Sequence, residues 1–104
     1  MINTQIIRSP TRNTVEMLRQ RMSKRARDLL EEHSAGGTLS ALALMQGRLV
    51  DMFAAADIAD KAAPVIVTEV LGLCPQHFNM IAIFGDVAAV DTAIQAVVAR
   101  MPQM

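Results

Sequence analysis

The stretch GLCPQHFN, residues 72–79, contains the only cysteine of the chain, Cys74, which is followed by Pro75 and, three residues on, by His77. A single thiol cannot form a disulfide within its own chain. It also supplies only one of the about four ligands that a structural zinc ion or an iron–sulfur cluster requires. The composition by itself therefore favours the ordinary role of a free cysteine, that of a small buried hydrophobe.

Cys74 and His77 could also be read as a nucleophile and its general base, because residues three apart in a loop can meet. The sequence supplies no orienting acid at a recognisable spacing and no evident substrate pocket. Thiol catalysis is therefore the weakest hypothesis, and we expect no enzyme.

Composition limits the other classes of function. At 104 residues the chain forms one domain, and its ten basic and ten acidic residues cancel, so nothing calls for nucleic acid or an anionic membrane. No run approaches the about 20 apolar residues of a membrane span, and the polar start MINTQIIRSPTRNT lacks the apolar core of a signal peptide. We expect a cytoplasmic protein with a reduced thiol.

Positive charge is concentrated near the N-terminus. Six of the ten basic residues fall between residues 12 and 27, namely Arg12, Arg19, Arg21, Lys24, Arg25 and Arg27. Such a cluster could neutralise phosphates, so a basic-helix binding module is one alternative function. Acidic residues interleave with the basic ones, however, and stacking aromatic residues are absent. A solvated helix face explains the pattern better.

The first third of the chain, residues 1–38, predicts a short strand over residues 4–9 and a long basic amphipathic helix over residues 14–33. The helix is indicated by apolar residues at spacings of three and four, Val15, Leu18, Met22, Ala26, Leu29 and Leu30, and it stops before Gly36–Gly37. We expect this segment to belong to the same domain as the core formed by residues 39–104.

The core begins with a strand over residues 39–45 and a helix over residues 49–63. The inner stripe of that helix is expected to contain Leu49, Val50, Phe53, Ala56, Ile58 and Ala59. β-Branched residues predict strands over residues 65–70 and 78–84, which should pair as a hairpin.

Asp86 should cap a last helix, which presents Val87, Val90, Ile94, Val97 and Val98 and ends near Pro102. The resulting order of strand, helix, strand, strand, helix predicts a ferredoxin-like α+β sandwich with its helices on one face of a mixed sheet.

The runs LSALALMQGRLVDMFAAADIADKAAPVIVTEV and IAIFGDVAAVDTAIQAV resemble the shell-protein domain of bacterial microcompartments (the BMC domain) over about residues 39–98. The resemblance implies a flat cyclic homohexamer that tiles with other shell proteins around enclosed enzymes. It also implies that the loop between the second and third domain strands, here Leu73–His77, lines the central pore.

Ordinary members of that family end with a strand after the last helix, whereas this chain stops almost directly after it. The predicted strand at residues 4–9 could supply the missing element, as in circularly permuted shell proteins. The long basic helix has no counterpart that the resemblance identifies.

Gly72, Leu73, Cys74, Pro75 and Gln76 match the G-x-C-P-Q pore motif of GrpU, a shell-protein subgroup of glycyl-radical propanediol microcompartments. This likeness implies an iron–sulfur cluster, [4Fe–4S], on the hexamer axis, where six copies of Cys74 would exceed the four thiolates required. The cluster would serve electron transfer across the shell, with enclosed redox enzymes as partners, or it would act as a redox-sensitive plug. The alternative is a metabolite pore without a cluster.

The neighbours of Cys74 fit either alternative. Pro75 stiffens the loop, Gly72 widens the choice of backbone conformation, and Gln76 and His77 are either groups around the cluster or polar groups of the pore rim. Lys61 stands where shell-forming relatives place the lysine that packs across the edge between hexamers. A solvated lysine near a helix end is the competing interpretation.

Overall fold

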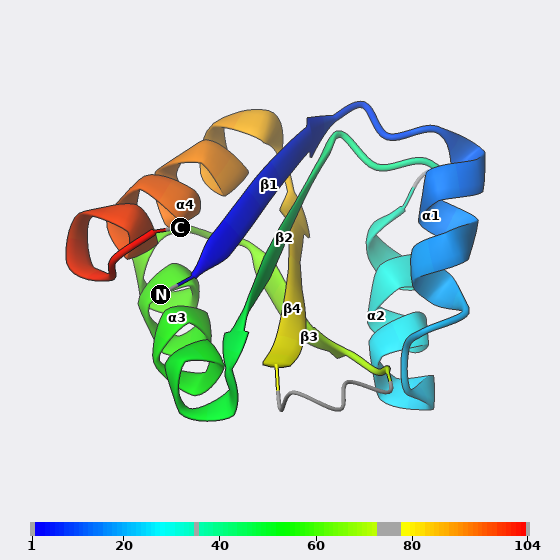
Figure 1. Ribbon diagram of the computed structural model, residues 1–104. Coiled ribbons are helices and arrows are strands. Elements are labelled where there is room, and N and C mark those ends of the chain that lie inside the picture. Colours follow the sequence, from blue (N-terminus) through cyan, green and yellow to red (C-terminus); the bar gives the residue numbers. More distant parts are fainter. Residues whose placement is uncertain (1, 35, 73–77, 104) are drawn as a thin grey trace.

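The computed structural model describes residues 2–34, 36–72 and 78–103. A four-stranded sheet lies between two pairs of helices (Figure 1). The elements follow one another as β1 (Asn3–Arg8), α1 (Arg12–Arg19), α2 (Lys24–His33), β2 (Ala41–Arg48), α3 (Leu49–Ala62), β3 (Ile66–Val70), β4 (Phe78–Gly85) and α4 (Val87–Arg100). The predicted α+β class is confirmed, and so is the β3–β4 pairing.

The strands are arranged in the order β1-β2-β4-β3, and each neighbouring pair is antiparallel. The prediction of a mixed sheet is therefore wrong. β2 and β3 do run in the same direction, as strands joined through a helix often do, but β4 inserts between them and separates them. Among the described strands, β3 is therefore an edge strand that pairs on one side only.

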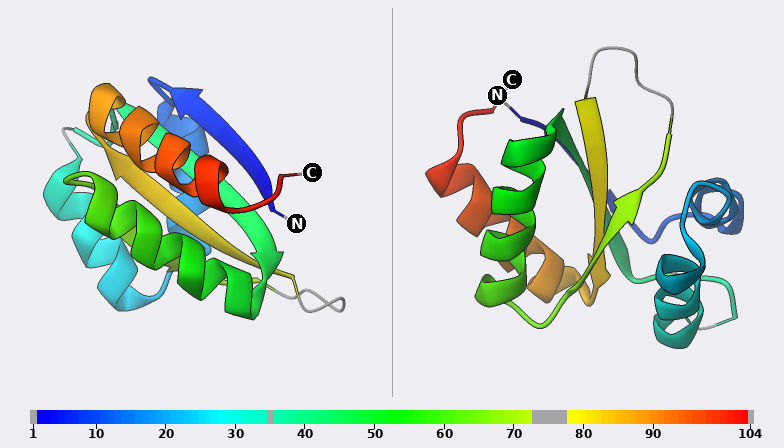
Figure 2. Two further views of the ribbon diagram at one scale, coloured as in Figure 1. Left: turned by 90° about the vertical axis from the view of Figure 1, so that its left-hand side faces the viewer. Right: turned by 90° about the horizontal axis from the view of Figure 1, so that it is seen from below.

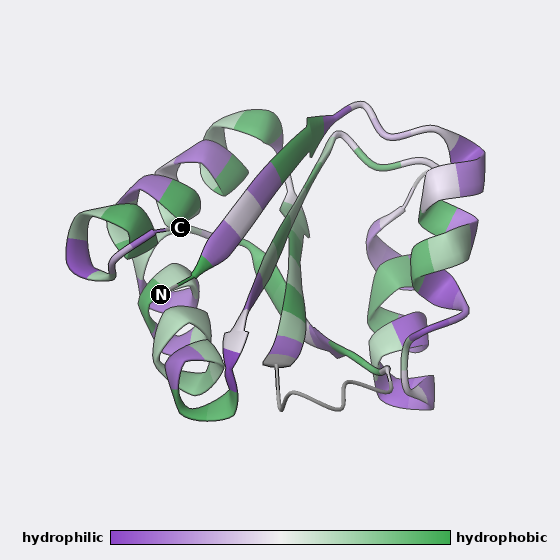
Figure 3. Cartoon of the chain, in the orientation of Figure 1, coloured by the Kyte–Doolittle hydropathy of each residue, from purple (hydrophilic) through white to green (hydrophobic). Residues whose placement is uncertain are grey.

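Helices cover both faces of the sheet, not one face as expected, as the view from below shows (Figure 2). On one face α3 and α4 pack against Ala41, Ala43 and Met45 of β2; on the other, α1 and α2 pack against the alternating side chains Leu42 of β2 and Phe84 of β4. Apolar residues consequently run along the central strands. Helices α1 and α2, in contrast, carry both apolar and polar residues, on different sides of each helix (Figure 3).

The predicted single helix over residues 14–33 is wrong, because α1 ends at Arg19 and α2 begins at Lys24. Ser23 marks the start of the second helix: its hydroxyl accepts a hydrogen bond from the Ala26 N–H at 3.2 Å and so caps the N-terminus of α2. The predicted inner face is nevertheless largely confirmed in the two shorter helices. Five of its six residues are buried, namely Val15, Leu18, Met22, Ala26 and Leu30.

The expected inner stripe of α3 is partly wrong. Met52, Ala55 and Ala59 face the core, whereas Val50 and Phe53 are 73% and 65% exposed. Because α3 is apolar on nearly all sides, its sequence does not define which stripe faces inward. For α4, Asp86 occupies the predicted capping position, but its side chain makes no capping hydrogen bond.

The two ends of the chain lie side by side (Figures 1 and 2). The Ile2 N–H donates to the Pro102 carbonyl at 3.0 Å, and the Thr4 hydroxyl donates to Gln103 Oε1 at 2.7 Å. β1 therefore lies where a strand following α4 would lie. The circular permutation stays a prediction that this proximity fits.

We expect that β1 can be moved from the start of the chain to its end without loss of the fold. A variant that starts at Pro10 and carries residues 2–9 after Gln103, through a short glycine linker, should fold and keep its unfolding free energy within about 2 kcal/mol, since the loop that must close is short. Circular dichroism and urea unfolding measure this. A variant that lacks residues 2–9 altogether is the control and should unfold readily; equal instability of the two variants would contradict the prediction.

Candidate functional site

The structure describes the two ends of the predicted pore segment. Leu73, Cys74, Pro75, Gln76 and His77 lie outside the described residues, while Gly72 precedes them and β4 follows them. A Cβ at Gly72 would meet open space, so crowding does not require glycine there. Among the described residues no three His, Cys, Asp or Glu side chains are grouped to hold a metal.

Backbone hydrogen bonds hold both ends of this segment. At one end the Leu71 N–H donates to the Arg21 carbonyl at 2.6 Å, which ties the end of β3 to the break between α1 and α2. At the other end Phe78 is paired with Arg48, at the end of the central strand β2. Residues 73–77 are thus joined to a fixed frame that includes the N-terminal helices.

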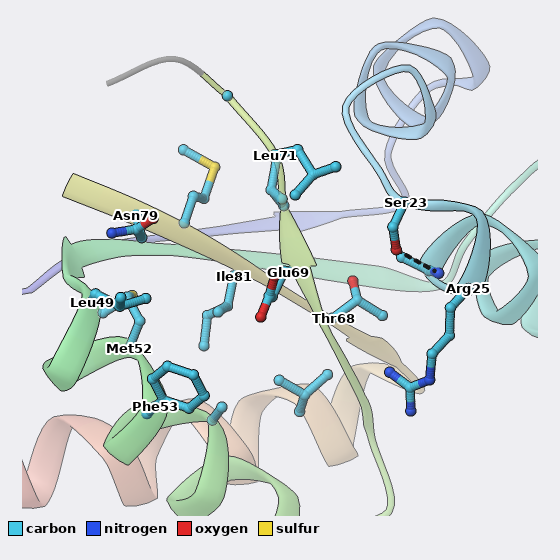
Figure 4. A pocket seen from close by; sticks show the side chains of 16 residues that line it. Ser23, Arg25, Leu49, Met52, Phe53, Thr68, Glu69, Leu71, Asn79 and Ile81 are labelled. Atoms are coloured by element: carbon cyan, nitrogen blue, oxygen red, sulfur yellow. Dashed lines mark hydrogen bonds between the residues drawn. The ribbon is translucent and has the colours of Figure 1, made fainter. Parts of the chain in front are cut away.

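A groove of about 420 Å³ runs along the edge strand β3 and reaches both ends of this segment. Its walls come from the start of α2, the first half of α3, and strands β3 and β4. Arg25 and Thr68 lie on one side of β3, and Phe53 and Ile81 lie on the other (Figure 4). Leu71, Gly72 and Asn79 close the groove beside residues 73–77.

Three large apolar side chains that line this groove are exposed: Leu49, Phe53 and Leu71, which we call the edge patch. Leu49 and Phe53 are four residues apart on α3 and therefore share one side of that helix. Exposed apolar side chains gathered at one place mark an interaction site more often than scattered ones do. The edge patch is not predicted from the sequence, because the helical spacing of Leu49 and Phe53 assigns both residues to the core.

Thr68 adds an unusual polar group to the groove. Its side chain is 5% exposed, and its Oγ1 has no hydrogen-bond partner among the described residues. A buried hydroxyl without a partner costs free energy. Arg25 and Glu69, on opposite sides of β3, likewise form no ion pair within the described part of the chain.

The other predicted residues lie away from the groove. Lys61 is exposed near the end of α3, where its Nζ is 2.7 Å from Asp57 Oδ2. His33 contacts the Leu29 carbonyl through Nδ1 at 2.9 Å, as expected for a histidine at a helix end. None of the described helices is long and apolar enough to cross a membrane.

The basic cluster is partly neutralised within the chain. Arg19 pairs with Glu31 at 3.1 Å, and Lys24 pairs with Asp28 at 2.8 Å. Arg27 donates to the Met22 carbonyl at 2.7 Å. These contacts favour the solvated helix face over a surface built to bind phosphates.

The comparisons with known proteins agree with the fold. Residues 41–104 match the family model of the BMC domain. The ligand-free GrpU microcompartment shell protein from Pectobacterium wasabiae is 34% identical, with a TM-score of 0.69 over 91% of this chain and 98% of that chain. The ligand-free GrpU shell protein from Clostridiales bacterium 1_7_47FAA is 30% identical, with a TM-score of 0.65 over 91% and 86%. No curated protein matches the chain.

The unpartnered hydroxyl predicts an unusual response to substitution. Thr68→Val should raise the unfolding free energy of the dissociated chain by about 1 kcal/mol, because it removes a buried polar group that has no partner. Urea unfolding of dilute protein measures the change. Thr4→Val is the matched control and should destabilise, since the Thr4 hydroxyl does have a partner, Gln103. Destabilisation by Thr68→Val would show that Oγ1 is hydrogen-bonded.

Proposed function

Because the chain belongs to the BMC-domain family of bacterial microcompartment shell proteins, we propose that it assembles into a cyclic homohexamer with residues 73–77 around the axis. The proposal is supported by the likeness to GrpU shell proteins over 91% of the chain. It is also supported by the position of residues 73–77, which connect β3 and β4 at one end of the sheet. As a shell component, the protein has a structural role.

The lone thiol acquires a use only in such an assembly. Each chain contributes one Cys74, and the described residues of the same chain contain no group of three His, Cys, Asp or Glu side chains that could hold a metal. Around a sixfold axis, six thiols would face a common centre, and four thiolates are enough for a [4Fe–4S] cluster. The donor set therefore fits a cluster shared between chains and does not fit one held by a single chain.

Cys74 would hold the cluster, and the cluster would supply one-electron transfer. The chain itself positions the thiol: the frame at Leu71 and Phe78 fixes where residues 73–77 begin and end. Pro75 restricts the backbone directly after the ligand. Gln76 and His77 would stand beside the cluster or at the pore rim.

A pore that contains a cluster is a poor channel for metabolites, so the function that follows is an electron relay between the lumen and the outside of the shell. Enclosed redox enzymes would be its partners. The alternative, a metabolite pore without a cluster, keeps the same assembly and gives Cys74 no ligand role.

Tiling into a shell would place Lys61 at the outer edge of the hexamer. Lys61 is 12 residues beyond Leu49, about 18 Å along α3 at 1.5 Å per residue. α3 starts directly after β2, whose end is paired with the start of β4. Lys61 thus lies at the end of α3 that is remote from residues 73–77, where its side chain is exposed and would have to exchange the ion pair with Asp57 for a contact to a neighbouring hexamer.

The deciding experiment is anaerobic purification followed by size-exclusion chromatography with mass determination, a visible absorption spectrum, and iron and sulfide assays on the same peak. We expect a coloured hexamer that contains less than one cluster per chain. A colourless hexamer that resists reconstitution with iron and sulfide would support the metabolite pore. A protein that stays monomeric at high concentration would overturn the proposed assembly.

Cys74→Ser separates the cluster from the assembly. We expect the hexamer to keep its mass while iron and visible absorption are lost, because a serine hydroxyl is a poor ligand for iron in such a cluster. His77→Gln is the control and should retain iron. Loss of the hexamer in Cys74→Ser would show that the thiol is needed for assembly and would contradict this division of roles.

A further inference from the structure

We propose that the groove along β3 is the surface through which each chain contacts the next copy around the axis, and that α2 forms one wall of this contact. This inference rests on the proposed hexamer and identifies which part of the chain builds it. The occupant of the groove is a second copy of this chain.

Continuity with residues 73–77 identifies that occupant. If these segments meet around one axis, the residues beside them must lie near the neighbouring copy. Leu71, Gly72 and Asn79 adjoin the segment in sequence and also line the groove. The groove therefore begins where neighbouring copies converge and extends outward along the edge strand.

The edge patch supplies apolar contact area at this place. Phe53 is 65% exposed although phenylalanine is usually buried, and the exposed side chains of Leu49 and Leu71 line the same groove. Burial of such side chains against a second copy would remove apolar surface from water, which is the main favourable term in association. In a chain of this size, assembly would also add to the stability of a small core.

Several polar groups in the groove have no hydrogen-bond or ion-pair partner among the described residues. The Thr68 hydroxyl is buried and unpartnered among the described residues, and the outer edge of β3 pairs with no other described strand. Arg25 and Glu69 bring charges of opposite sign to the two sides of that strand. A strand or loop of a neighbouring copy could pair with the outer edge of β3 and bring opposite charges to Arg25 and Glu69.

The contact must be heterologous, because a cyclic assembly joins two different surfaces of identical chains. The family match begins at residue 41, whereas Ser23, Arg25 and Ala26 of the groove wall precede it. The N-terminal helices lie outside the match to the family model and gain a function in this contact. They extend the subunit contact on the side of the sheet opposite α3 and α4.

Phe53→Glu tests the surface, with Met17→Glu as the matched control. Met17 is 63% exposed, close to the 65% of Phe53, but lies on α1 outside the groove. We expect Phe53→Glu to elute as a monomer with an unchanged circular dichroism spectrum and Met17→Glu to elute as a hexamer. Leu49→Glu is a second groove variant, to be measured in the same way if Phe53→Glu unfolds.

Arg25→Glu tests the contribution of α2. It should weaken assembly at least about tenfold, measured by the concentration at which the hexamer dissociates. Arg12→Glu makes the same change of charge on α1, outside the groove, and should leave that concentration unchanged.

The outcomes separate this inference from the proposal on which it rests. A wild-type protein that is monomeric at every concentration would refute the hexamer itself. A hexameric wild type with hexameric Phe53→Glu and Leu49→Glu variants would leave the hexamer standing and overturn the interface. Hexamers that tolerate Arg25→Glu as well as Arg12→Glu would remove α2 from the contact.

Discussion

Burial of the central strands on both faces is the constraint on which the rest of the structure depends. β2 and β4 carry apolar side chains on both faces of the sheet. Such strands are stable only if another layer covers each face. α3 and α4 cover one face, and α1 and α2 cover the other. The N-terminal helices are therefore a required part of the core and not an appendage to it.

The same constraint determines the frame around residues 73–77. To lie along the sheet, the N-terminal segment breaks into two helices, and the break brings the Arg21 carbonyl to the Leu71 N–H. α2 then starts beside the edge strand, where Ser23 and Arg25 face the groove. One packing requirement thus links the core, the ends of the candidate pore segment and the surface that we assign to the neighbouring copy.

In the hexamer that we propose, symmetry would explain how so small a chain could hold a metal cluster. One cysteine per chain cannot surround a cluster, but each chain would need to contribute only one thiol. The tertiary structure then needs to supply only two things: a fixed connection for the loop and a contact that repeats around an axis. The groove beside β3 adjoins the loop and could meet the second need.

The sequence by itself determined the order and kind of the elements except for the break between α1 and α2, and it determined the apolar face of these two helices, the β3–β4 hairpin and the family likeness. These follow from local periodicity, from β-branched runs and from short motifs. The tertiary structure decided where Leu49, Phe53 and Thr68 lie. α3 is apolar on nearly every side, so only packing against the sheet selects Met52, Ala55 and Ala59 for the core and leaves Phe53 outside. The insertion of β4 between β2 and β3 is likewise a long-range pairing, which no local pattern encodes, and it is this pairing that makes β3 an open edge.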